Sequence, residues 1–89
     1  MAVKITIEQN GKIMLEQLAP SVYAAYKESE NETCVAIAGT SSAADRAKAL
    51  EALAMAMVKA ARDTGATDRD LREYKRFLIS IVKDTIKNA

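Results

Sequence analysis

The sequence predicts an α+β protein: a small antiparallel β-sheet of three to four strands in a meander, followed by an antiparallel helical hairpin packed on one face. Two observations predict this. In the first 40 residues apolar side chains alternate with polar ones around an Asn-Gly pair. Residues 42–64 and 67–87 instead repeat their apolar side chains every three to four positions, and Gly65 separates these two segments. Because 89 residues are enough for only one core, we expect a single domain over residues 1–89.

The β-rich part covers residues 1–40 and begins with a hairpin. Its first strand has a half-buried pattern, in which polar residues separate Val3, Ile5 and Ile7. Asn10-Gly11 then predicts a type I′ turn, which needs positive φ at both central positions. The returning strand covers residues 12–18.

Two registers of this hairpin fit the sequence. A two-residue loop pairs Ile7 with Met14, whereas a three-residue bulged loop pairs Ile7 with Leu15. We favour the bulged version, since it keeps the apolar Ile7, Leu15 and Ile13 together on one face.

Residues 20–28 fit either a strand or a short helix. In a strand, alternation places Val22, Ala24 and Tyr26 on one face. In a helix, Pro20 occupies the first turn and Tyr23 aligns with Tyr26. We favour the strand. Residues 33–38 are short, apolar and partly β-branched, which is typical of a buried strand.

Both predicted helices begin with a capping box, Ser42 with Asp45 and Thr67 with Asp70. Each has an apolar stripe that we expect to face the core. In the first helix the stripe consists of Leu50, Leu53, Ala54, Met57 and Ala61. In the second it consists of Leu71, Tyr74, Leu78, Ile81 and Val82.

The composition excludes several chemistries. The chain has no histidine and one cysteine, Cys34, so a Ser–His–acid triad, a Cys–His dyad and a zinc site within one chain are all excluded. We therefore expect no enzyme activity, no cofactor and no metal. A single cysteine, no apolar run of about 20 residues and no signal pattern predict a cytoplasmic protein without membrane contact.

Three groups of residues are candidates for binding. Thr40, Ser41 and Ser42 lie between a predicted strand and a helix, where amides and hydroxyls could hold a phosphate; an ordinary turn with an N-cap explains the same residues. A basic stripe on the last helix could contact phosphates or a partner protein, or could be a solvated face. It consists of Arg69, Arg72, Arg76, Lys83 and Lys87.

The third group lies off the apolar stripe of the first helix and consists of Ala52, Met55 and Ala56. Small side chains allow another helix to approach closely, and methionine adapts to varied partners. We expect an oligomer interface here. Single exposed apolar residues are also normal on monomers.

The layout also resembles that of a known group of proteins. A short strand with Asn-Gly, a later strand ending in the sequence VAIAG (35–39) and a helix with KALEALAMAM (48–57) together resemble small uncharacterised proteins encoded by phages and prophages. The resemblance implies an accessory role, such as an inhibitor of a host defence complex or a sponge for a nucleotide signal.

These observations rank three functions. The first is a non-catalytic interaction protein, a homo-oligomer and a phage-type inhibitor of a host protein complex. The second is a binder of a small phosphorylated ligand such as a nucleotide. The third is a nucleic-acid-binding accessory protein, which we do not favour because the net charge is only +1.

Overall fold

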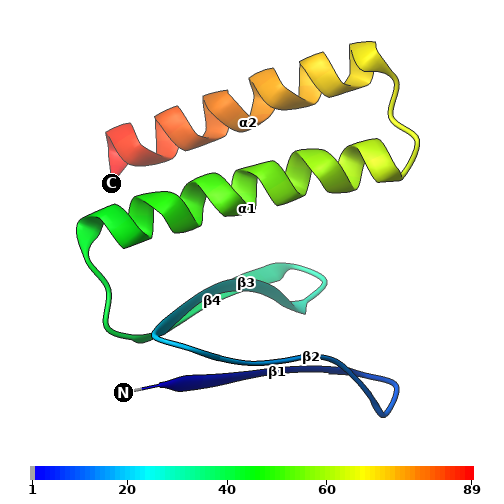
Figure 1. The fold of residues 1–89 in the computed structure, drawn as a ribbon. Helices are drawn as coiled ribbons and strands as arrows, with labels where there is room; N and C mark the ends of the chain where they lie inside the picture. The colour runs from blue at the N-terminus through cyan, green and yellow to red at the C-terminus, as the bar shows by residue number, and fades with distance from the viewer. Residues whose placement is uncertain (1) are drawn as a thin grey trace. The chain divides into compact units, whose positions relative to one another are not determined.

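A computed structural model describes residues 2–89. Four strands precede two helices (Figure 1), which confirms the α+β class with antiparallel strands. The elements are β1 (Val3–Gln9), β2 (Lys12–Ala19), β3 (Ser21–Ser29), β4 (Glu32–Gly39), α1 (Ala43–Asp63) and α2 (Asp68–Asn88). The chain divides into two compact units. We call the one that ends at Ala47 the hairpin unit and the other, Lys48–Ala89, the helical unit.

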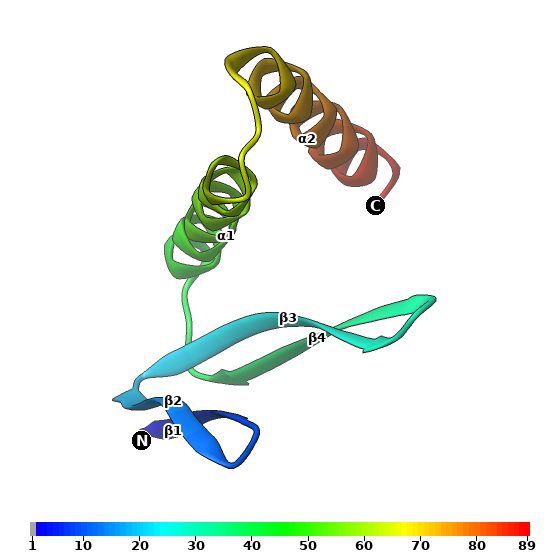
Figure 2. The same ribbon diagram turned by 90° about the vertical axis from the view of Figure 1, so that its right-hand side faces the viewer.

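The four strands form two separate two-stranded sheets, β1–β2 and β3–β4, rather than one meander (Figure 2). The reason lies at Pro20. This residue alone separates the end of β2 at Ala19 from the start of β3 at Ser21, whereas an antiparallel hairpin needs a connection of at least about two residues. The chain therefore turns from one hairpin directly into the next.

The first hairpin has the favoured register but not the expected loop. Asn10 and Gly11 have φ of 53° and 78°, as a type I′ turn requires, and Gln9 pairs with Lys12 across a two-residue loop. A bulge next to the turn then shifts the register so that Ile7 pairs with Leu15. The extra residue lies in the strand and not in the loop.

Residues 21–29 form a strand, which decides between the two interpretations of this segment. Tyr23 lies opposite Ile37, and Tyr26 lies opposite Cys34. Because alternate residues of a strand point to opposite faces, the two tyrosines are on opposite sides of the hairpin. They do not form one contact surface.

The two hairpins meet where their ends come together, at Pro20. Val3 pairs with Ala19 on one side, and Ser21 pairs with Gly39 on the other. Gly39 has a φ of +89°, and a Cβ atom there would collide with the Pro20 carbonyl oxygen and lie 2.8 Å from Ser21 Cα. Only glycine fits this approach without a shift of the backbone.

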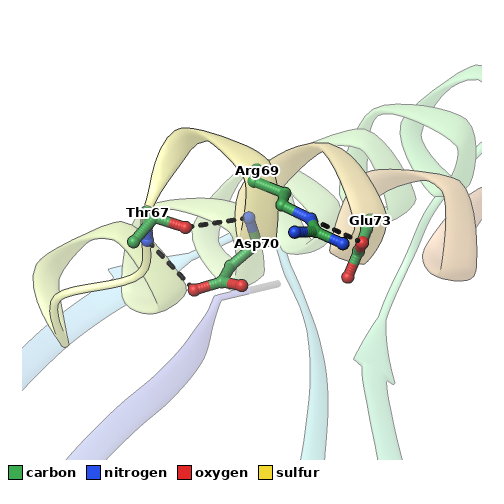
Figure 3. Close-up of polar contacts among 4 residues, drawn as sticks. All are labelled: Thr67, Arg69, Asp70 and Glu73. Atoms are coloured by element: carbon green, nitrogen blue, oxygen red, sulfur yellow. Dashed lines mark hydrogen bonds and ion pairs between the residues drawn. The ribbon is translucent and has the colours of Figure 1, made fainter.

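The two capping boxes form as predicted. Thr67 Oγ1 accepts a hydrogen bond from the Asp70 amide at 3.1 Å, and Asp70 Oδ2 accepts one from the Thr67 amide at 3.2 Å (Figure 3). Ser42 and Asp45 exchange the same pair of bonds at 3.0 and 3.1 Å. Each box satisfies amides of a first helical turn that have no partner within the helix.

The helical unit has a small core. Leu71 is the one buried apolar side chain among residues 2–89, with 6% of its area exposed. Tyr74, Leu78 and Val82 are half-buried, so most of the predicted α2 stripe packs inward, while Ile81 is exposed. No helix in residues 2–89 has the length and hydropathy needed to cross a membrane.

The predicted α1 stripe is largely exposed, contrary to expectation. Leu50, Leu53 and Met57 each expose 40% or more of their area, whereas Val58 and Ala61 are half-buried. Ala61 is thus a member of the stripe that is partly covered. Val58 lies outside the stripe and lines a groove together with Leu78 of α2, so the side of α1 that borders this groove lies next to the stripe and does not coincide with it.

Candidate interaction surface

The most conspicuous surface feature is uncovered apolar area. Among residues 2–89, sixteen large apolar side chains expose 40% or more of their area, and they occur on all six elements. Single exposed apolar residues need no explanation, but soluble monomers rarely expose them in contiguous patches. The hairpins and helices therefore all offer surface for association.

Both faces of each hairpin carry such side chains. In β1–β2, Ile7 and Leu15 lie opposite each other on one face and Leu18 lies on the other. In β3–β4, Val35 and Ile37 share one face, whereas Tyr26 is on the other. One covering layer on each hairpin would leave the opposite face open.

Within the helical unit, α1 and α2 border a groove of about 720 Å³. Its lining is mainly apolar, and we call this part of the lining the floor: α1 contributes Met55 and Val58, while α2 contributes Leu78 and Ile79. Val58 and Leu78 are half-buried, whereas Met55 is 66% and Ile79 59% exposed. The groove is therefore an open apolar trough.

We call the charged part of the groove's lining the rim, and cations outnumber carboxylates in it. Lys59 Nζ lies 2.7 Å from Asp63 Oδ2, so these two charges compensate each other. Arg62 and Lys75 also line the groove, and neither has a carboxylate partner among residues 2–89. The rim thus has two uncompensated positive charges beside the apolar floor.

The predicted basic stripe continues from this rim. Arg76 and Lys83 line a second hollow of about 320 Å³, which shares Ile79 with the groove. Arg69 Nε is 3.4 Å from Glu73 Oε1 (Figure 3), and Asp84 lies beside Lys83 in the second hollow. Carboxylates therefore interrupt the row of positive charges in the basic stripe.

The structure thus brings together two of the predicted patches. Met55 and Ala56 line the groove, and Arg76 and Lys83 line the hollow that adjoins it. The remaining predicted residues of these patches do not line either hollow: they are Ala52, Arg69, Arg72 and Lys87. Lys75 and Ile79 were not among the predicted residues; they lie on α2 between its apolar stripe and its basic stripe.

The predicted phosphate site is occupied by the protein's own cap. The Ser42 amide and hydroxyl both bond to Asp45, and the Ser41 carbonyl accepts a bond from Arg46 Nη1 at 3.3 Å. Thr40 is exposed. The Asp45 carboxylate places a negative charge where a phosphate would bind, so the capping interpretation explains these residues.

A cluster near the β3–β4 turn contains Glu28, Glu32 and Cys34, whose ligand-type atoms lie within 4.8 Å of one another. The Cys34 thiol donates a hydrogen bond to Glu28 Oε2 at 3.0 Å. This bond raises the pKa of the Cys34 thiol, with desolvation as a smaller cause in the same direction and a bond with Tyr26 opposing both. The hydrogen bond explains why Glu28 and Cys34 lie together. It needs the protonated thiol, whereas metal ions bind the thiolate.

Comparison with protein-family models, curated proteins and solved structures finds no match to this chain. The fold class and the surface are therefore the basis for any statement about function.

Proposed function

We propose that the protein is a non-catalytic interaction protein that acts as a small homo-oligomer. The observation that carries this proposal is the uncovered apolar area, sixteen large side chains among residues 2–89 that are spread over all six elements. Exposed apolar patches mark interaction surfaces in soluble proteins. Small chains with marginal cores commonly gain stability by self-association.

The distribution of this area supports a second copy as the partner. Each hairpin has large apolar side chains on both faces, and α1 has them on two sides, at Leu53 and at Met55. Covering one face of each element leaves another face open. A further copy of the chain supplies additional apolar layers of matching composition.

Within this class we propose an inhibitor that occupies a surface of a host protein complex. Its support is the resemblance in layout to small phage-encoded proteins and the lack of histidine, the usual general base. The test is to capture the target with the tagged chain and to assay the captured complex. A stoichiometric complex that keeps its full activity would contradict an inhibitory role.

The homo-oligomer is tested by light scattering on a sizing column over a hundredfold range of protein concentration. We expect a mass of at least twice the 9.7 kDa of one chain, falling towards 9.7 kDa on dilution because association follows mass action. A constant mass of one chain at every concentration would contradict the proposal. It would mean that the apolar side chains are either covered within one chain or reserved for another protein.

A further inference from the structure

One edge of α2 carries an exposed aromatic ring between carboxylates. Phe77 is 61% exposed, and Ile81, one turn further on, is exposed as well. Glu73 precedes Phe77 by four residues and Asp84 follows Ile81 by three, so all four lie along one side of the helix. We call these four residues the acidic edge. An apolar anchor with an acidic flank is the chemical complement of a groove with an apolar floor and a cationic rim.

The groove between α1 and α2 has this complementary character. Met55, Val58, Leu78 and Ile79 supply apolar floor, and Arg62 and Lys75 supply charges without a carboxylate partner among residues 2–89. We propose that the acidic edge of one copy binds in the α1–α2 groove of a second copy. This inference rests on the proposed homo-oligomer and names its interface.

Charge decides which surfaces can meet. Two grooves facing each other would bring Arg62 and Lys75 of both copies together, and two acidic edges would bring Glu73 and Asp84 together. Like charges at an interface disfavour association, whereas the pairing of groove with edge joins opposite charges. The exposed pair of Arg69 and Glu73 contributes little, so Glu73 can exchange this partner for a cation of the rim.

The arrangement on α2 makes the contact head-to-tail. Lys75 and Ile79 each lie two residues from Phe77, which is about 160° around a helix of 3.6 residues per turn. The groove side and the edge side of α2 thus face in nearly opposite directions, and one copy can use both at once. A contact of this kind closes into a ring or extends into a filament, and it does not form a twofold dimer.

Charge reversal tests the contact. The groove variant is Arg62→Glu with Lys75→Glu, and the edge variant is Glu73→Lys with Asp84→Lys. We expect each to raise the dissociation constant of self-association by at least about tenfold, because like charges then face each other. The chain with all four substitutions restores opposite charges, so we expect it to reassemble with an affinity near that of the wild type.

Two matched controls accompany these variants. Lys12→Glu with Lys48→Glu makes the same change in net charge as the groove variant, at residues that do not line the groove. Phe77→Ala removes the anchor, and Ile86→Ala removes an equally exposed apolar side chain of α2 outside the groove and the edge. We expect both controls to associate as the wild type does and Phe77→Ala to weaken association. Circular dichroism confirms that every variant keeps its helices.

The outcomes separate this inference from the proposed function. If the wild type associates and the groove and edge variants associate equally well, the homo-oligomer stands and the groove-to-edge contact is wrong. The same holds if the chain with four substitutions stays dissociated. A wild-type chain that is monomeric throughout overturns both, and uptake of an acidic amphipathic peptide by that monomer would assign the groove to another protein.

Discussion

The hairpin unit and the helical unit are held together by different interactions. In the hairpin unit the main interactions are between backbone groups. Two antiparallel ladders form β1–β2 and β3–β4, and Gly39 lies directly against the backbone of Pro20 and Ser21. In the helical unit each helix satisfies its own backbone, and few side chains are covered: Leu71 is buried, and Tyr74, Leu78 and Val82 are half-buried. Backbone hydrogen bonds thus form the hairpins between strands and the helices within each helix.

This difference explains where the apolar surface remains. A ladder satisfies backbone amides and carbonyls but covers neither face of the sheet, and an isolated two-stranded sheet is at best marginally stable in water. Helices satisfy their backbone internally and need only one covered stripe. The hairpins therefore gain more from an additional layer than the helices do, and single substitutions should act differently in the two units.

The largest contrast is expected between two glycines with positive φ, one in each unit. Gly39→Ala combines strain at a φ of +89° with a collision against Pro20 and Ser21, and we expect it to lower the free energy of unfolding by about 3 kcal/mol. Gly65→Ala has nothing within 4 Å of the added Cβ, so only the strain at a φ of +92° remains, about 1 kcal/mol. Urea unfolding at one fixed protein concentration measures both. Equal losses of unfolding free energy in the two variants would show that the close contact of Gly39 with Pro20 and Ser21 adds no destabilisation.

The local features that form the hairpins, their turns and strand register, are also the features that the sequence predicts best. Asn10-Gly11 indicated the first turn, and the match of Ile7 with Leu15 indicated its register. The bulge could not be located, because a bulge in the strand and an extra loop residue give the same pairing beyond it. The split into two sheets follows from the one-residue connection between β2 and β3, and the alternation of apolar residues on both sides of that connection conceals it.

The candidate surface was predictable only in pieces. Met55 and the cations Arg76 and Lys83 stood out on their own helices, but a groove requires both helices at once. Lys75 and Ile79 fall between the stripes of α2 when that helix is considered alone. Leu50, Leu53 and Met57 form a regular apolar stripe and were expected in the core, since periodicity shows that a face is apolar and does not show what covers it.

A smaller effect is expected at the helix caps, which are alike in the two units. Thr67→Ala removes the side chain that accepts a bond from the Asp70 amide, and we expect a loss of about 1 kcal/mol. Ser42→Ala should cost a similar amount, since it removes the same bond to Asp45. Thr67→Ser keeps the hydroxyl and is the control. A loss confined to one of the two caps would show that the units differ in their local rules as well as in their packing.

The last prediction concerns a chemical reaction that only the hairpin unit can undergo, since Cys34 is the single cysteine and lies in that unit. Its thiol donates to Glu28, and this hydrogen bond is the largest cause that raises the pKa of Cys34. At a given pH below that pKa, less thiolate is present than for an ordinary cysteine, so alkylation by iodoacetamide is slow. Glu28→Gln removes the carboxylate, lowers the pKa and should speed alkylation at pH 8.

Glu32→Gln is the matched control for this measurement, since Glu32 belongs to the same cluster but makes no hydrogen bond to Cys34. The expected order is faster alkylation for Glu28→Gln and little change for Glu32→Gln, read from the pH dependence of the rate. Equal acceleration by both would mean that the summed negative charge near the β3–β4 turn, and not the bond to Glu28, holds the thiol protonated. Because the helical unit contains no cysteine, the alkylation rate reports on the hairpin unit alone.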